Sequence, residues 1–355
     1  MIFYLYFFLF LVLFSYGKTA VFQDKKENFW TLDYVRIFFF ALVISVFLGI
    51  RDLSIGCDSG TYVKIFQDPK SYNAEIEKGF AFINKLLGYL SKNGNFYLFS
   101  ISFFIAFMQV LCYYKISNEN YLMYSILYLS FFYFYQFHLN IMREGLAITF
   151  VTFAFILYRK RKFKLYFLFT LIACTLHITA LIGFLYPVFY KINKTKFTSV
   201  FYMIITIVLL FTPLVSRFIA FIPEVHWSIS KIKWYFVIAD PVRIKQTHLI
   251  SFSIIFLFIL NYSKMEKSSC FDLYKFYIVF FAFISIFGEC VLVYDRFYFY
   301  LQVLEPILIY EFRVLFKEKR VFNVLILFFS FLMSLFTIFI WGSRNFITPY
   351  KIGIL

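Results

Sequence analysis

Residues 142–190 read MREGLAITFVTFAFILYRKRKFKLYFLFTLIACTLHITALIGFLYPVFY, which is two long apolar stretches separated by a basic loop. Each stretch is close to, or longer than, the roughly 20 apolar residues that a helix needs to cross a bilayer. Short loops on the cytoplasmic side of membrane proteins are rich in Lys and Arg. The basic loop here contains Arg159, Lys160, Arg161, Lys162 and Lys164. We therefore predict two helical membrane segments whose connection lies in the cytoplasm.

The composition of the whole chain supports a membrane protein. Of its 355 residues, 62% are hydrophobic and only 15% are charged, whereas soluble proteins average about 45–50% and about 25%. These values exclude a soluble enzyme, a coiled coil and a disordered chain. The formal charge of +16 is explained by cytoplasmic loop residues, so we expect no nucleic-acid partner. The five cysteines are scattered without metal-ligand or redox spacing, so we expect neither a metal nor a cofactor.

Eleven apolar segments are candidates for crossing the membrane. They are Ile2–Tyr16, Tyr34–Ile50, Phe96–Ile116, Tyr121–Leu139, Met142–Tyr158, Leu165–Tyr190, Thr198–Phe221, Leu249–Tyr262, Leu273–Tyr294, Phe297–Phe316 and Val321–Trp341. No soluble domain or internal repeat interrupts this pattern. We therefore expect an all-α, polytopic integral membrane protein with about 10–11 transmembrane helices. The segments are expected to form a single membrane domain over residues 1–355.

The longest polar stretches, residues 51–95 and 222–248, are expected to be external loops. For residues 51–95 this side follows from the orientation that the basic loop sets; for residues 222–248 it also requires the re-entrant segment predicted below. Within the first stretch, apolar side chains recur at helical spacing, which predicts an amphipathic helix lying in the membrane interface. The apolar residues of that helix are Phe80, Ile83, Leu86, Leu87 and Leu90.

The loop charges conflict with eleven complete crossings. If Leu165–Tyr190 crossed the membrane completely, the Lys and Arg residues of three later loops would face outside. If that segment enters and leaves by the same face, these residues become cytoplasmic. We therefore predict a re-entrant or broken helix at Leu165–Tyr190, with polar Thr175 and His177 near its middle. A wrongly assigned span elsewhere would produce the same change of side, and that alternative stays open.

Three arginines are expected on the external side, against the rule that favours positive charge inside. Arg143 and Arg296 lie in very short connections or at the start of a helix, and Arg51 follows the second apolar segment. A guanidinium at membrane depth costs a few kcal/mol, so it usually has a partner and a function. Together the three predict a pocket for a polyanion, most naturally a diphosphate, held by bidentate contacts. The alternative is that each side chain reaches the lipid headgroups.

Other polar residues are expected to meet these arginines. Candidates for acid–base or positioning roles are Asp58, His177 and Asp295. Each also has a purely structural alternative. Asp58 would be a turn residue, His177 a hydrogen-bonded core residue, and Asp295 an ion-pair partner. Candidates for contacts with substrate are Tyr62, Glu77, Asn140 and Tyr300. Spacing supports part of this set, because residues three or four positions apart share a helix face.

These residues resemble the motifs of a known family, the EpsG-like polysaccharide polymerases, which are relatives of the Wzy O-antigen polymerases. The matching elements are Arg51, Gly56-x-Asp58-x3-Tyr62, Glu77-x-Gly79-Phe80, Asn140-x2-Arg143-x2-Leu146-Ala147, Leu176-His177-Ile178-Thr179-Ala180-Leu181 and Asp295-Arg296-Phe297-x2-Tyr300. They occur in order over most of the chain. The sequence departs from the pattern at Glu144, where Gln is usual, and at Cys57, where Thr is common.

The resemblance implies a multi-pass enzyme of the bacterial inner membrane that makes O-antigen, exopolysaccharide or capsule. Such a glycosyltransferase would move oligosaccharide from undecaprenyl diphosphate to a second lipid-linked repeat unit on the external, periplasmic face. No nucleotide sugar and no metal are expected. Arg143 and Arg296, with Arg51, would bind the diphosphate, and His177 or Asp58 would assist the acceptor hydroxyl.

The implied partners are the undecaprenyl-diphosphate-linked oligosaccharide and the lipid bilayer, together with a chain-length regulator and a flippase. Three other classes stay open. The chain could be a lipid-linked oligosaccharide flippase, an O-antigen ligase or acyltransferase, or a purely structural membrane protein. Analysis of the products would separate them, because only a polymerase joins repeat units while they are still on the lipid carrier.

Overall fold

The computed structural model describes residues 29–69, 76–193, 195–212, 230, 233–234, 236, 241–242 and 246–341. These residues form helices and contain no strand, which confirms the all-α prediction. The apolar segment Ile2–Tyr16 and most of the expected external loop 222–248 lie outside the described residues. The chain divides into two compact units, one of Met1–Gly183 with Arg320–Leu355 and one of Phe184–Lys319. The single membrane domain stays a prediction.

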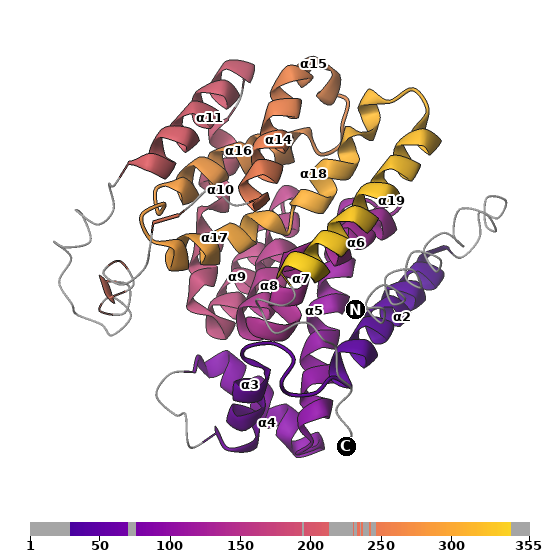
Figure 1. Cartoon of the computed structure of the whole chain (residues 1–355), viewed down its shortest axis with the longest axis vertical. Coiled ribbons are helices and arrows are strands. Elements are labelled where there is room, and N and C mark those ends of the chain that lie inside the picture. Colours follow the sequence, from indigo (N-terminus) through magenta and orange to yellow (C-terminus); the bar gives the residue numbers. More distant parts are fainter. Residues whose placement is uncertain are drawn as a thin grey trace. The chain divides into compact units, whose positions relative to one another are not determined.

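The first unit is built on four helices that pack against one another in chain order. These are α2 (Phe29–Gly49), α5 (Gly94–Ile116), α8 (Met142–Arg159) and α9 (Phe163–Leu176). Helix α2 packs on α5, α5 on α8, and α8 on α9 (Figure 1). Helix α5 begins at Gly94, two residues before the predicted start at Phe96, because the side chain of Asn93 accepts hydrogen bonds from two backbone N–H groups of its first turn.

Shorter elements complete the first unit. They are α3 (Ser59–Gln67), α4 (Lys78–Leu90), α6 (Tyr121–Ser130), α7 (Phe132–Tyr135), the π-helix η2 (Gln136–Asn140), the 3-10 helix η3 (Ile178–Leu185), α19 (Lys319–Phe336) and the π-helix η5 (Thr337–Trp341). Helices α3 and α4 pack together, and α4 also packs on α9 (Figure 1). The polar loop after α2 therefore folds back onto the helices that carry the predicted site residues.

Helix α4 confirms the helix predicted in the first polar stretch. Phe80 and Leu87 are buried against the protein, together with polar Asn84. Large apolar residues on the rest of the helix surface are exposed: Phe82, Leu86, Tyr89 and Leu90. Part of the predicted apolar stripe, Phe80 and Leu87, therefore packs inside the unit. The position of α4 in the membrane interface stays a prediction.

The second unit is organised around one long helix. Helix α16 (Phe271–Ser285) packs against α10 (Tyr186–Ile192), α11 (Lys196–Phe211) and α17 (Val291–Gln302). The other elements are α14 (Gln246–Leu260), α15 (Tyr262–Met265), α18 (Glu305–Glu311) and the 3-10 helix η4 (Phe312–Leu315). Helix α11 starts at a capping box, in which Thr195 and Thr198 bind each other's backbone N–H groups.

Some of the helices are suited to crossing a membrane by their length and composition. Within the described residues, two helices meet both criteria, Gly94–Ile116 and Lys319–Ile340. A third span results if Phe132–Asn140 and Met142–Arg159, which are bent by 119° at a break, are taken together. Several other expected spans occur as shorter apolar helices. The membrane character of the chain is supported, and the number of about 10–11 spans stays a prediction.

Breaks in the helices confirm one predicted interruption and correct other predicted spans, among them Phe297–Phe316, which is interrupted between Gln302 and Glu305. The segment Leu165–Tyr190 is interrupted at His177, where the backbone is extended (φ −156°, ψ 133°), so the broken-helix alternative is confirmed. The predicted span Tyr121–Leu139 is interrupted at Phe131. The predicted span Leu273–Tyr294 is interrupted after Ser285, because the chain turns there before α17 begins.

Candidate functional site

Arg51 is fully buried in the first unit and holds the loop after α2 in place. Its guanidinium donates to the Ser59 hydroxyl and to the His138 carbonyl, each at 3.1 Å, and also to the Leu48 carbonyl. These three partners come from the end of α2, the start of α3 and η2. These hydrogen bonds hold the loop after α2 in place. The predicted contact of Arg51 with a diphosphate stays a prediction.

Asn140, at the end of η2, binds the same loop from the other side. Its side-chain oxygen accepts a hydrogen bond of 2.7 Å from the backbone N–H of Cys57. The adjacent Gly56 has a φ of +88°, and a Cβ there would lie 2.8 Å from the Leu139 carbonyl oxygen. Only glycine fits this turn without strain. Because the chain bends directly after Asn140, Asn140 and Arg143 do not share a helix, and their spacing does not place them on one face.

Cys57 gives a direct test of which side of the membrane this loop faces. Its side chain is exposed, whereas Cys112, Cys270 and Cys290 are buried. Partial burial and the Asp58 carboxylate raise the pKa of the Cys57 thiol. We expect a membrane-impermeant maleimide to label Cys57 in intact spheroplasts, and labelling to accelerate as pH rises, because the thiolate is the reactive form. Cys57→Ser should remove this label, and labelling only after permeabilisation would reverse the predicted orientation.

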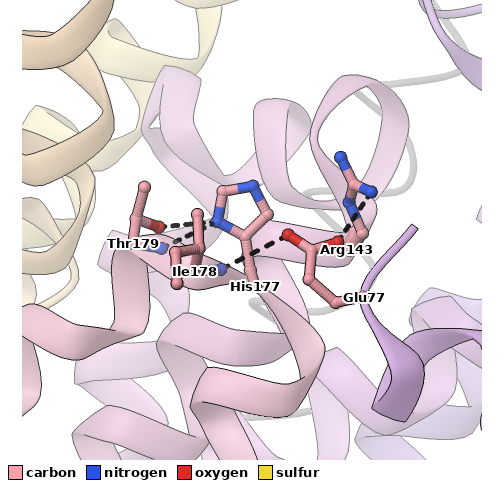
Figure 2. Close-up of polar contacts among 5 residues, drawn as sticks. All are labelled: Glu77, Arg143, His177, Ile178 and Thr179. Carbon is pink, nitrogen blue, oxygen red and sulfur yellow. Dashed lines mark hydrogen bonds and ion pairs between the residues drawn. The ribbon is translucent and has the colours of Figure 1, made fainter. Parts of the chain in front are cut away.

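Arg143 lies in the first turn of α8, as predicted, and forms an ion pair across the first unit. Its guanidinium lies 2.8 Å from a carboxylate oxygen of Glu77, and both side chains are partly exposed. The other oxygen of Glu77 accepts a hydrogen bond of 3.3 Å from the backbone N–H of Ile178, at the start of η3. Figure 2 shows the carboxylate lying between these two donors. A guanidinium and a helix-terminal N–H therefore converge on one anion.

The position of Glu77 depends on a close approach between α4 and α9. Gly79 lies so near Thr175 that a Cβ at this position would overlap the threonine side chain and its carbonyl oxygen. Phe80 is buried next to it and makes an edge-to-face contact with Tyr62 at 6.1 Å between ring centroids. This packing brings the chain before α4 next to the break at His177.

His177 belongs to a hydrogen-bonded chain that ends at a buried carboxylate. Its Nδ1 lies 2.7 Å from the Thr179 hydroxyl, and that hydroxyl donates to Glu144 at 3.0 Å. The imidazole is nearly buried, and only 1% of Glu144 is exposed. Together, Glu77, Arg143, Glu144, His177 and Thr179 form what we term the Arg143 cluster. Its members come from the start of α4, the first turn of α8 and the break between α9 and η3.

The remaining predicted residues of the first unit lie in the loop and in α3. Asp58 is exposed at the N-terminal cap of α3, and its carbonyl accepts from the Tyr62 N–H at 2.9 Å. Asp58 and Tyr62, four positions apart, are therefore joined by a helical backbone hydrogen bond. Tyr62 is half-buried against Phe80. Their roles in acid–base catalysis and in substrate binding stay predictions.

Asp295, Arg296 and Tyr300 lie in the second unit, within α17. The prediction placed the first two in a short connection or at the start of a helix, whereas α17 begins at Val291 and continues to Gln302. Asp295 and Arg296 are half-buried, and Tyr300 is buried. Their predicted roles stay predictions.

The same helix carries a tyrosine that belongs to a buried polar network. The Tyr298 hydroxyl donates to the Thr247 carbonyl at 2.8 Å and lies 2.5 Å from the Ser251 hydroxyl. Ser251 and Tyr277 in turn donate to the carboxylate of Glu305, at 3.0 and 2.8 Å. Hydroxyl donors thus satisfy a buried carboxylate, which a membrane protein requires inside its core.

A comparison with protein-family models identifies the chain. The model described as the EpsG family matches residues 34–352, which is most of the sequence. The chain belongs to the EpsG family. This family comprises Wzy-like polysaccharide polymerases, so the resemblance carried by the sequence motifs is confirmed. No curated protein and no solved structure matches the sequence.

Membership of the EpsG family gives the chain a coarse assignment as a membrane protein of a glycosyltransferase-like polymerase family. Within this EpsG-family chain, sequence reasoning did not select Glu144, Thr179 or Glu305 as site residues. The sequence motifs identified Glu144 only as a position where the family usually has Gln. Its position in the first turn of a helix, next to Arg143, was the available signal, because an acidic residue there faces the positive end of the helix.

Proposed function

We propose that this EpsG-family protein is a polymerase that transfers oligosaccharide from undecaprenyl diphosphate to a second lipid-linked repeat unit. The reaction would take place at the external face of the bacterial inner membrane. The observation that carries the proposal is the anion held between Arg143 and the Ile178 N–H. In the resting protein that anion is the Glu77 carboxylate. During the reaction, a phosphate oxygen of the donor would take the same two contacts.

The proposed transfer step uses groups within the Arg143 cluster. A hydroxyl of the acceptor sugar gives its proton to the imidazole of His177, and its oxygen forms a bond to the anomeric carbon of the donor. The bond from that carbon to the diphosphate oxygen breaks. Undecaprenyl diphosphate leaves with the electron pair, and Arg143 stabilises the charge that develops on it. Cleavage of the bond between the sugar and the diphosphate supplies the driving force, so the reaction needs no nucleotide sugar.

The other predicted residues have places in this proposal. Asp58, exposed beside α3, is the second candidate for the base. Asn140 and Tyr62 shape the loop through which the acceptor would reach the cluster. Asp295, Arg296 and Tyr300 are proposed to contact substrate, with Arg296 on the diphosphate. Arg296→Lys, which keeps the charge but changes its shape, tests that assignment by itself.

The experiment that tests the function is deletion of the gene followed by sizing of the surface polysaccharide. We expect the deletion strain to carry single repeat units in place of long chains, and a plasmid copy to restore the long chains. Complete loss of exported repeat units would instead indicate a flippase. Long chains that remain on the lipid carrier would indicate a ligase. An unchanged polysaccharide would contradict the proposed function in this strain.

A further inference from the structure

The buried carboxylate of Glu144 has a specific place in α8. It is the third residue of the helix, where the backbone N–H groups of the first turn are not used within the helix. Negative charge is stabilised at this end by the helix dipole. Only 1% of the side chain is exposed, so a carboxylate here depends on donors from its surroundings. One such donor is the Thr179 hydroxyl, at 3.0 Å.

The direction of the hydrogen bonds follows from counting protons. A threonine hydroxyl has one proton to donate, and in this arrangement it is directed to Glu144. The contact of 2.7 Å between the same hydroxyl oxygen and Nδ1 of His177 then requires the proton to lie on Nδ1. The Thr179 N–H is also directed at Nδ1, at 3.4 Å, and on its own this contact would place a lone pair on Nδ1. We give priority to the hydroxyl contact because it is the shorter one, at 2.7 Å, and because the hydroxyl proton is directed to Glu144. The lone pair of a neutral imidazole is thereby assigned to Nε2.

We propose that Glu144 and Thr179 are positioning residues that hold His177 with its proton on Nδ1, so that Nε2 is the atom that accepts the proton of the acceptor sugar. Figure 2 shows the second ring nitrogen directed away from Thr179. The inference rests on the proposed function, in which His177 is the base. It adds two residues that the function did not use and assigns the reacting atom.

The relay has the order of a carboxylate, a hydroxyl and an imidazole. The carboxylate acts on the ring through the hydroxyl, and it stabilises the imidazolium that forms when Nε2 takes a proton. Among the described residues, charged groups that these contacts place in this region are Glu77 from the chain before α4, and Arg143 and Glu144 from α8. Because Glu77 and Arg143 form an ion pair with each other, Glu144 is the carboxylate that acts on the imidazole through Thr179.

The first test observes the imidazole without requiring catalysis. The full-length protein contains four histidines, so ¹⁵N labelling of histidine followed by solid-state NMR in lipid gives a short set of ring signals, and His177→Asn assigns one pair. We expect His177 to show the tautomer with the proton on Nδ1. Thr179→Val should increase the other tautomer, whereas Thr179→Ser should restore the original one. The same ring signals in Thr179→Val and in the unaltered protein would overturn the relay.

The second test uses membranes of the deletion strain, which hold the strain's own lipid-linked repeat units, supplemented with the purified protein. Thr179→Val should reduce the rate of polymer formation by about 10–100-fold, the usual effect of removing a group that orients a catalytic one. Thr179→Ser should recover most of this loss. Glu144→Gln keeps an acceptor for Thr179 but removes the charge. It should therefore shift the acid limb of the pH–rate profile to lower pH, because the imidazolium loses its stabilising carboxylate.

The two tests separate failure of the relay from failure of the proposed function. If His177→Asn retains full polymer formation, the imidazole is not the base, and the proposed mechanism fails whatever the NMR signals show. If His177→Asn is inactive while Thr179→Val and Glu144→Gln match the unaltered protein in rate and pH profile, His177 acts without the relay. A Glu144→Gln profile that is lower at every pH without a shift would also overturn the positioning role.

Discussion

Replacing Arg143 by alanine should reduce polymer formation by roughly 100-fold or more, the loss seen when a donor to a developing oxyanion is removed. Arg143→Lys should retain part of the activity, with a loss of about 10-fold, because the charge remains while the two-pronged guanidinium contact is lost. The measurement is the amount and length of polymer made in the deletion strain by each variant, at matched protein levels in the membrane.

The matched control for this prediction lies on the same helix. Arg159 ends α8, at the opposite end from Arg143, and Arg159→Ala removes an equal charge outside the Arg143 cluster. We expect this control to make polymer normally. If Arg143→Ala and Arg143→Lys both leave the amount and the length of the polymer unchanged, Arg143 does not bind the donor diphosphate.

Replacing His177 by asparagine should remove a factor of about 10²–10⁴ from the rate, which is the range that a positioned general base contributes. Asparagine can still donate a hydrogen bond to Thr179, so the local fold is expected to persist while the base is lost. Polymer formation is measured in the deletion-strain membranes. Binding of added lipid-linked repeat units to the purified variant is measured separately. The variant should bind the donor and fail to transfer it.

A control and a competing candidate accompany the His177 prediction. Lys164 lies near the other end of α9, and Lys164→Ala should leave the rate unchanged. Asp58→Asn tests the alternative base in the exposed loop. If Asp58→Asn causes the larger loss and His177→Asn the smaller one, the roles of the two residues in the proposed mechanism are exchanged.

Much of the helical architecture could be predicted because apolar runs and basic turns are local signals. The helix over Gly94–Ile116 was expected from residue 96, and α8 and α9 meet at the basic loop, where Arg161 adopts a left-handed φ of 59°. The break at His177 was also expected, since a conflict among loop charges pointed to that segment. The helix positions are determined by residues that are close together in the sequence, whereas the break was inferred from the charges of loops farther along the chain.

The break before α17 could not be predicted from hydropathy. Asp295 and Arg296 form a charged pair within an aromatic run, and such a pair indicates a loop, yet both lie inside a helix. The actual turn falls at Gly288, in an apolar stretch, where a Cβ would come within 3.2 Å of the Leu210 backbone. A close contact with a distant helix determines this turn, and no local pattern contains that information.

In the candidate site, the sequence indicated which residues take part but not which of them contact one another. The sequence motifs selected Glu77, Arg143 and His177, and the structure places these three in one cluster. The pairing of Glu77 with Arg143 was not predicted, because it depends on how α4 packs against α9. Arg51 was grouped with Arg143 as an external charge, but it donates to Ser59 and to the distant His138 carbonyl, which only the folded chain brings next to it.

The ion pair between Glu77 and Arg143 affects which lipids can bind to Arg143. Membranes contain anionic phospholipids, whose headgroups are attracted to basic side chains. An empty guanidinium would collect such headgroups by simple mass action. Glu77 already neutralises Arg143. An external anion must therefore displace an intramolecular carboxylate, which is present at a high effective concentration. In the proposed function, a headgroup with one charge would gain little by that exchange and a diphosphate would gain more, so the Glu77–Arg143 ion pair would favour the donor over ordinary phospholipid.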